Sequence, residues 1–163
     1  MLRRVSASEG SILSVQHNLA ITYECLGRLE QALQMKRDVY SGQLKLDGEE
    51  HYDTLLAANN YAASLVELER FKEAKKLMRK TMPVARRALS DEHDLTLNLR
   101  KVYADCLCSD ASASQDDVAE AIEIMEDVQR RARRVFGDGH PNWVDLPRDL
   151  MAARDKLASF EDT

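Results

Sequence analysis

Three histidines that recur along the chain are the first candidates for chemistry to consider. His51 and His93 lie 42 residues apart, and His140 follows after a further 47 residues. Imidazole is a common zinc ligand, but zinc needs its ligand atoms about 2.0–2.3 Å from the ion. The intervals place the histidines in successive links between structural units, separated by more than one helix diameter. We therefore expect hydrogen bonds that stabilise these links, and no metal site.

Cys106 and Cys108 are the next candidate pair, because thiols bind metals and form disulfides. Two positions apart on a helix, their side chains point to different sides, unlike the ligands of a closed zinc site. We predict core packing for one thiol and exposure for the other. With Cys25 the chain has three cysteines, and this odd, irregularly spaced set favours a reducing compartment over a disulfide framework.

The densest positive patch consists of Arg130, Arg131, Arg133 and Arg134. Such a patch could contact phosphate or an acidic partner. The alternative is a solvated face at the C-terminal end of a helix, where cations complement the helix dipole. Arg86 and Arg87 occupy the corresponding end of the preceding unit, which favours the structural alternative. The net charge of −5, with both signs interspersed, gives no net attraction to nucleic acid or to an anionic membrane, so we expect neither as a partner.

Catalytic and targeting signals are lacking in the sequence. It contains no nucleophile motif, phosphate loop, paired-acid signature or metal cluster, so we expect no catalytic residues, no cofactor and no enzymatic activity. Residues 1–10 lack the apolar run of a signal peptide, and no segment approaches the roughly 20 apolar residues of a membrane span. The cytoplasm is therefore the default prediction.

The elements that carry these residues repeat along the chain. Small residues recur at an interval of 42 positions: Ala20, Ala62 and Ala104, Ala32 and Ala74, and Thr54 and Thr96. Internal repeats of this length are typical of solenoids, in which each unit buries its apolar face against its neighbours. With 31% charged residues, six glycines and three prolines, the composition suits helices and very little strand.

The first unit is predicted to be a helical hairpin. Apolar residues recur at the helical period over residues 12–26, at Ile12, Val15, Leu19, Tyr23 and Leu26. Glycine at position 27 ends this helix, since it accepts the left-handed backbone that follows a helix end. A second helical pattern runs from residue 29 to about residue 46. Residues 1–11 form a lead-in that is either flexible or a partial repeat, and the second alternative would mean that the chain is cut from a longer array.

The second hairpin is the most regular unit. Asp53 or Thr54 can cap its first helix, which carries a broad apolar stripe. Its partner helix begins near Phe71. Pro83 predicts a kink or an early stop in this partner, because proline lacks the amide hydrogen that would bond residue 79.

The third hairpin opens at Asp94 or Leu95 and carries about five extra residues within positions 109–117. This segment has the composition of a surface loop, and Asp116 or Asp117 can cap the helix over residues 118–135. A last helix, with Asp145 as a plausible cap, has no partner helix. We therefore predict an all-α solenoid with repeats at about 12–51, 53–93 and 94–140, a capping helix at 142–158 and a tail at 159–163.

The repeated motif can be compared with a known family. The first copy has Asn18-Leu19-Ala20-x-x-Tyr23, then Gly27 and Ala32. Later copies have Asn59-Asn60-Tyr61-Ala62 with Glu69 where glycine is usual, and Tyr103-Ala104. The links read Gly48-Glu-Glu-His51-Tyr-Asp-Thr54, Ser90-Asp-Glu-His93-Asp-Leu-Thr96 and Gly137-Asp-Gly-His140-Pro141. This pattern resembles the tetratricopeptide repeat, in the 42-residue form of kinesin light chains. No sustained heptad pattern is visible, so the resemblance concerns the repeats alone.

The resemblance implies that the first helix of each pair lines a concave groove that binds peptides. The candidates by this alignment are His17, Asn18, Ile21, Glu24, Asn59, Asn60, Ala63, Glu67, Asn98, Lys101 and Asp105. Asn18 and Asn60 look like the family's asparagine ladder, whose amides can hydrogen-bond a peptide backbone. The alternative for these amides is hydrogen bonding between helices. The basic clamp that some family members use for a terminal carboxylate looks absent, because only Lys101 lies at a suitable place.

We therefore predict a protein interaction scaffold that binds a protein or peptide in this groove. The alternative is a regulatory or targeting repeat domain of a larger enzyme or signalling protein. Nucleic-acid binding through the arginine face is the third and weakest interpretation.

Overall fold

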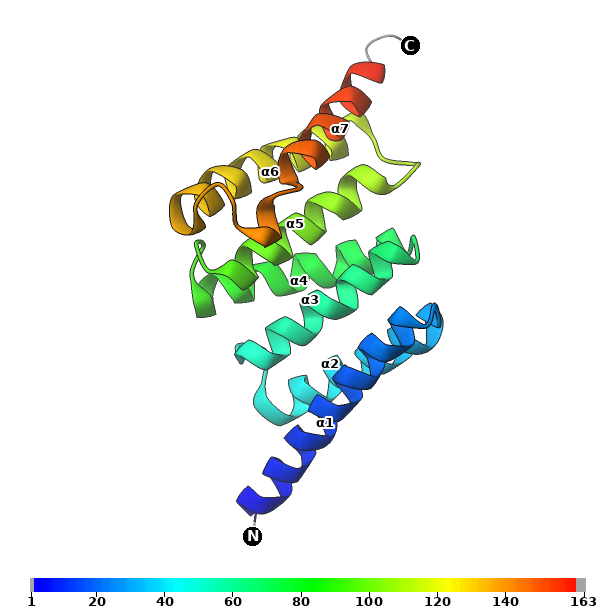
Figure 1. Cartoon of the computed structure of the whole chain (residues 1–163), viewed down its shortest axis with the longest axis vertical. Helices are drawn as coiled ribbons and strands as arrows, with labels where there is room; N and C mark the ends of the chain where they lie inside the picture. The colour runs from blue at the N-terminus through cyan, green and yellow to red at the C-terminus, as the bar shows by residue number, and fades with distance from the viewer. Residues whose placement is uncertain (1, 161–163) are drawn as a thin grey trace.

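Seven α-helices and one short 3-10 turn make up residues 2–160, the part of the chain that this computed structural model describes, with side chains described from residue 9 onward (Figure 1). Their bounds are α1 (Leu2–Cys25), α2 (Leu29–Asp47), α3 (Tyr52–Glu67), α4 (Phe71–Leu89), α5 (Asp94–Ser109), α6 (Gln115–Phe136), the turn Pro141–Trp143 and α7 (Leu146–Ser159). None of the helices in this part combines the length and the apolar character that a bilayer span requires.

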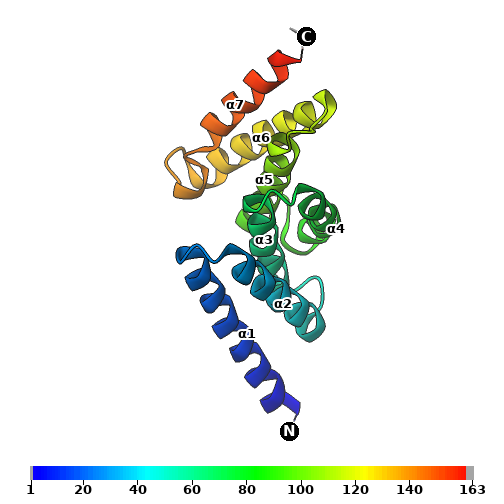
Figure 2. The ribbon, with the colours of Figure 1, turned by 90° about the vertical axis from the view of Figure 1, so that its right-hand side faces the viewer.

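Each helix packs mainly on its neighbours in sequence, which gives a stack of hairpins. The pairs α1/α2, α3/α4 and α5/α6 form the hairpins, and α7 packs against α6. The ends of the described chain lie at opposite ends of this stack (Figures 1 and 2). The predicted all-α solenoid of three hairpins and a final single helix is therefore confirmed.

The hairpins close over pairs of small residues. Six alanines at the repeated positions are completely buried: Ala20, Ala32, Ala62, Ala74, Ala104 and Ala121. Larger side chains such as Leu65, Met78 and Met125 fill the space around these crossings. Small residues are needed there because packed helix axes approach to about 8–10 Å. Cys106 is also fully buried, and burial raises its pKa to about 12, whereas Cys108 is half-buried and Cys25 is exposed.

The link histidines form the hydrogen bonds that the sequence led us to expect. His51 Nδ1 accepts from the amide of Asp53 at 3.3 Å, and His93 Nδ1 accepts from the amide of Leu95 at 3.1 Å. In the third link, His140 Nδ1 accepts from the amide of Asn142 at 3.4 Å. The histidines are thus the N-caps of the helical segments that follow them. The cap predicted at Asp53 or Thr54 is therefore corrected to His51, two to three residues earlier, whereas α5 begins at Asp94 as predicted.

The cap of α6 also differs from the prediction. Ser114 is the N-cap, and its hydroxyl accepts from the amide of Asp117 at 3.1 Å. The Asp117 carboxylate in turn accepts from the Ser114 amide at 3.2 Å. This reciprocal capping box satisfies two amides at once, which neither Asp116 nor Asp117 could do as a single cap. Asp145 does stand at the N-cap of α7, but its side chain makes no capping hydrogen bond.

Helix α4 continues through Pro83 to Leu89, so an early stop is wrong. Pro83 is exposed, and it removes the hydrogen bond to residue 79 and crowds the carbonyl of that residue. Thr81, Val84 and Ala85 around it are buried, so tertiary packing holds the last turn in place.

The N-terminal segment is helical where the sequence suggested a lead-in. Helix α1 begins at Leu2, so most of the segment 1–11 continues the first helix of the first hairpin. Residue 1, and residues 161–163 of the predicted tail, lie outside the described residues.

Replacing Ala62 by leucine should lower the free energy of unfolding by about 1–3 kcal/mol, because three additional carbon atoms would be forced into a close helix crossing. Urea unfolding followed by circular dichroism measures the change. The matched control is Ala63→Leu, one position along the same helix but exposed. Equal unfolding midpoints for the two variants would contradict the crossing as the structural constraint.

Candidate partner-binding groove

The predicted groove residues occupy equivalent positions on the first helices of the hairpins. His17, Asn59 and Lys101 share one position at intervals of 42, and Asn18 and Asn60 share the next. The five-residue insertion shifts the interval to 47 after α5, so that Arg148 and Asp149 on α7 continue these two rows. The equivalent positions nevertheless have different surroundings along the stack.

At the N-terminal end, α1, α2 and α3 enclose a polar cavity of about 180 Å³. Its lining brings together three predicted residues, His17, Asn18 and Asn60. A second, wider opening of about 430 Å³ adjoins it and shares Ser14, Gln43 and Asp53. Helix α3 packs extensively on α5, but α1 makes no comparable contact with α3, which leaves this space between the first two hairpins.

Gln43 is a groove residue that sequence reasoning missed. It lies on α2, a second helix, and only 8% of it is exposed. Its Oε1 is buried and accepts no hydrogen bond from the described residues, while the side chain borders both cavities. A buried acceptor without a partner is stabilised when a donor such as a peptide N–H forms a hydrogen bond with it. The repeat alignment gave no signal for it, because it considered only first helices.

A largely buried ionic network joins the three helices that line this groove. Lys36 on α2 is 7% exposed, pairs with Glu24 of α1, and donates to Ser64 Oγ of α3 at 2.8 Å. Ser64 Oγ donates to Glu24 at 2.7 Å. Burial opposes the charge on Glu24, but the hydrogen bonds from Lys36 and Ser64 outweigh it and lower its pKa. Glu24, a predicted groove residue, is therefore occupied in joining three helices.

His17 lies beside this network. Burial and the charge of Lys36 lower the pKa of His17, against the opposing effect of Glu24. The imidazole is therefore neutral at neutral pH and offers one donor and one acceptor to the cavity.

At the C-terminal end the charged candidates pair with one another. Lys101 Nζ lies 3.0 Å from Asp105 and 3.1 Å from Asp149 of α7. Burial disfavours the charge on Lys101, yet the two carboxylates outweigh it and hold its pKa above the ordinary value. Burial raises the pKa of Asp105, against the attraction of Lys101. Asp149 could have been found by carrying the five-residue shift into α7.

The remaining candidates lie outside both cavities. Asn59 and Asn98 are half-buried, and Asn59 Oδ1 has no hydrogen-bond partner among the described residues. Ile21, Ala63 and Glu67 are exposed on the first helices. The structure thus separates the predicted set into a polar N-terminal group, a self-paired C-terminal group and a few isolated residues between them.

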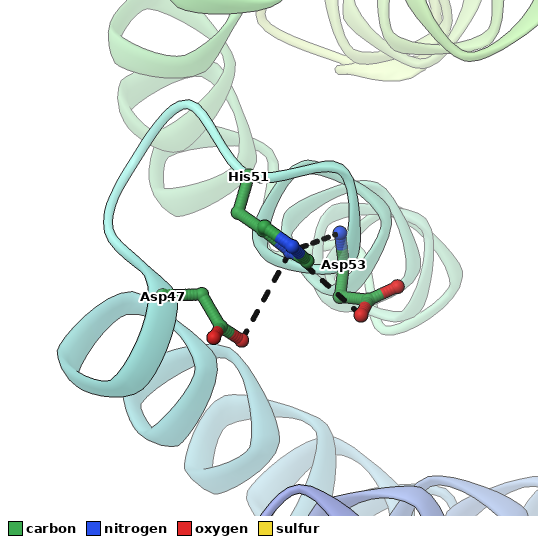
Figure 3. Close-up of side chains that lie close together, drawn as sticks. All are labelled: Asp47, His51 and Asp53. Atoms are coloured by element: carbon green, nitrogen blue, oxygen red, sulfur yellow. Dashed lines mark hydrogen bonds and ion pairs between the residues drawn. The ribbon is translucent and has the colours of Figure 1, made fainter. Parts of the chain in front are cut away.

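Asp47, His51 and Asp53 line the wider opening. Their side chains lie close together (Figure 3). Asp47 and Asp53 have carboxylate oxygens 3.9 Å and 3.7 Å from His51 Nδ1. These three ligand atoms are close enough for a metal ion, but all three residues are exposed and Nδ1 already accepts the Asp53 amide. The cluster is therefore best described as a helix cap that adds negative charge where the groove begins.

The arginine patch is paired with acids. Arg130 and Arg131 bind Asp127, Arg133 binds Asp138, and Arg134 reaches Glu92 in the preceding link. Arg100 of α5 also contacts Asp127, at 2.8 Å. These contacts favour the structural interpretation over a site for phosphate.

Comparison with known proteins now identifies the class. Two family models, both described as tetratricopeptide repeat, match residues 11–80 and 109–142. The chain belongs to the tetratricopeptide repeat family, whose repeats are in general protein–protein interaction modules rather than catalysts. No curated protein sequence matches it significantly.

Solved structures with similar repeats also match the chain. A crystal structure of a Podosopora anserina putative kinesin light chain with nearly identical TPR-like repeats matches with a TM-score of 0.76 and 24% identity, over 88% of this chain and 65% of that one. A single-substitution variant of the same protein matches with the same values. The chain spans about 65% of the length of these structures, and the likeness is one of fold. The family models confirm the predicted tetratricopeptide repeats, and these structures show the same repeat fold.

The Asp127 contacts predict a pH dependence. Burial opposes its charge, but hydrogen bonds from three arginines lower its pKa to about 2, below the ordinary 3.8. The contribution of a carboxylate with a lowered pKa is present above the ordinary value and is lost as the pH falls through the folded-state value. Asp127→Asn should therefore be less stable than the parent at neutral pH, and the difference should shrink as the pH falls from about 4 toward 2.

Urea unfolding midpoints over this pH range provide the measurement. Glu123→Gln, an exposed acid on the same helix, is the control and should show little difference from the parent at any pH. A difference for Asp127→Asn that does not change with pH would count against the ion pairs as its cause.

Proposed function

We propose that this chain is a protein interaction scaffold that binds an extended peptide segment in the groove between α1, α2 and α3. The observation that carries the proposal is the grouping of hydrogen-bonding side chains around the 180 Å³ cavity. Asn18 and Asn60 line it, and the buried Oε1 of Gln43 has no partner among the described residues. Alternating amide donors and acceptors suit the alternating N–H and C=O groups of a peptide backbone.

The charge at the groove mouth favours a basic residue in the peptide. Asp47 and Asp53 border the wider opening, and Lys36 deeper in the molecule is already neutralised by Glu24. A lysine or arginine in the peptide would meet uncompensated carboxylates there. At the other end, Lys101 is held by Asp105 and Asp149, which disfavours capture of a terminal carboxylate in this half of the groove.

The groove would serve equally well in a free-standing scaffold or in a regulatory or targeting domain of a larger enzyme or signalling protein. The cytoplasmic location stays a prediction from the sequence.

The test is selection from a random-peptide display library on the immobilised chain, followed by affinity measurement of the selected peptides by calorimetry. We expect selected peptides to contain a basic residue, and Asn18→Ala with Asn60→Ala to weaken binding by about ten-fold or more, since each lost amide pair is worth about 1 kcal/mol. Asn142→Ala, an exposed asparagine in the link before α7, is the matched control and should bind as the parent does.

Circular dichroism confirms that the variants remain folded. Selected peptides whose affinity is the same for the parent and the double variant would overturn the groove as the binding site.

A further inference from the structure

Helix α1 carries a stripe of apolar side chains that no described helix covers. Ile12 is 54% exposed, Val15 65%, Leu19 40% and Leu26 65%. Their helical spacing places them on one face of α1. We call these four residues the α1 stripe. A contiguous exposed apolar face of this kind marks an interaction site more often than scattered single residues do.

The equivalent positions on α3 and α5, the first helices of the second and third hairpins, are covered by neighbouring helices. Thr54 and Ala57 on α3, 42 positions after Ile12 and Val15, are 1% and 5% exposed. On α5 the corresponding Thr96 and Leu99 are fully buried. The faces of α3 and α5 that carry them pack on α2 and α4, which are the second helices of the preceding hairpins.

Two aromatic contacts mark these interfaces. The ring of Tyr61, equivalent to Leu19, stacks on Tyr40 of α2 with a centroid distance of 6.3 Å. In the next repeat Tyr103 accepts a hydrogen bond from Arg79 of α4 at 3.2 Å. The α1 stripe is therefore the first copy of an interface that is filled twice further along the chain.

A cavity beside the stripe supports the same conclusion. Ile12, Leu13 and Gly42 line an open, largely apolar pocket of about 400 Å³ at the N-terminal end of the stack. The equivalent residues Thr54, Leu55 and Val84 line a space of only about 10 Å³. Tyr40 from the preceding second helix borders this smaller space. The first hairpin thus has room for one large side chain from a further helix.

Ion pairs between the end of a second helix and the preceding link also recur along the chain. Arg87 at the end of α4 pairs with Glu50 in the preceding link at 2.8 Å, and Arg134 at the end of α6 pairs with Glu92 in its preceding link. Lys45 at the end of α2 is equivalent to Arg87 and borders the 400 Å³ pocket, but it has no ion pair with a described residue. A glutamate in a preceding link would complete the third pair.

We propose that the α1 stripe is a docking face for the second helix of a further hairpin of this repeat type, seated on α1 as α2 is seated on α3. That helix carries a large apolar side chain at the position of Tyr40 or Met82, which enters the open pocket, and a glutamate follows in its link to meet Lys45. The surface is distinct from the peptide groove, which lies on the side of α1 that carries His17 and Asn18.

The test adds such a hairpin from the chain itself. A copy of residues 52–93 is joined directly to Gly10, which keeps the 42-residue register and brings a second Met82 and a second Glu92 to the required places. Both the parent and the extended chain carry Cys25→Ser and Leu19→Cys, and the modification rate of the introduced thiol is measured by mass spectrometry. We expect the added hairpin to slow this rate by about ten-fold or more, because docking must open before the thiol can react.

The control places the thiol on the other side of α1 by Ile21→Cys. Ala63, the equivalent residue of the next repeat, is exposed although its hairpin is preceded by another, so the rate at position 21 should not change. Met82→Lys in the added copy alone should restore fast modification at position 19, since a charge would be placed in the apolar pocket.

Two results would overturn the proposal. One is an equal rate at position 19 with and without the added hairpin, when circular dichroism shows that the additional residues are helical. The other is protection of position 19 in the chain without the addition, rising with concentration and accompanied by a dimer mass in light scattering, because this would assign the stripe to a second copy. Neither result bears on peptide binding in the groove.

Discussion

The close crossing of two helices over a pair of buried alanines is the interaction on which the rest of this structure depends. A single hairpin of this kind buries little apolar surface by itself. Its outer faces must therefore be covered by the hairpins on either side. In α7 a methionine, Met151, takes the position of the crossing alanine and is 65% exposed, and no described helix packs upon it. The same geometry therefore explains the regular interior of the stack and the different character of its two ends.

Within this regular frame, small changes at equivalent positions decide which parts of the groove are available. Residues 17, 59 and 101 are a histidine, an asparagine and a lysine at one structural position. The histidine borders a cavity, whereas the lysine is held by carboxylates from two helices. The buried pairing of Lys36 with Glu24 is costly to desolvate, and it is tolerated because Ser64 provides further hydrogen bonding. These polar contacts fix how α1 lies against the second hairpin and thereby shape the groove.

Helix α1 presents two surfaces with different physical character. One is polar and concave, with amides around the cavity near His17 and carboxylates at its mouth. The other is the apolar α1 stripe, whose counterparts on α3 and α5 are interfaces between repeats. A solenoid can separate ligand binding from assembly in this way because each first helix turns one face toward the preceding hairpin and leaves another free.

The sequence by itself determined the architecture and the local chemistry of the links. The interval of 42 residues, the alanine pairs and the link histidines depend on short-range geometry, so periodicity and residue type were enough to predict the hairpins and the role of His51, His93 and His140. Only the tertiary structure decided burial and pairing. The apolar spacing on α1 predicted a helix but could not show that Val15 is 65% exposed, because exposure depends on a neighbouring helix. Gln43 and Asp149 reach the groove from elements distant in sequence, and α4 continues past Pro83 because buried neighbours hold its last turn. The contacts of Gln43 and of the last turn of α4 join residues whose separation in the chain carries no periodic signal, and Asp149 follows the repeat only once the five-residue insertion is counted.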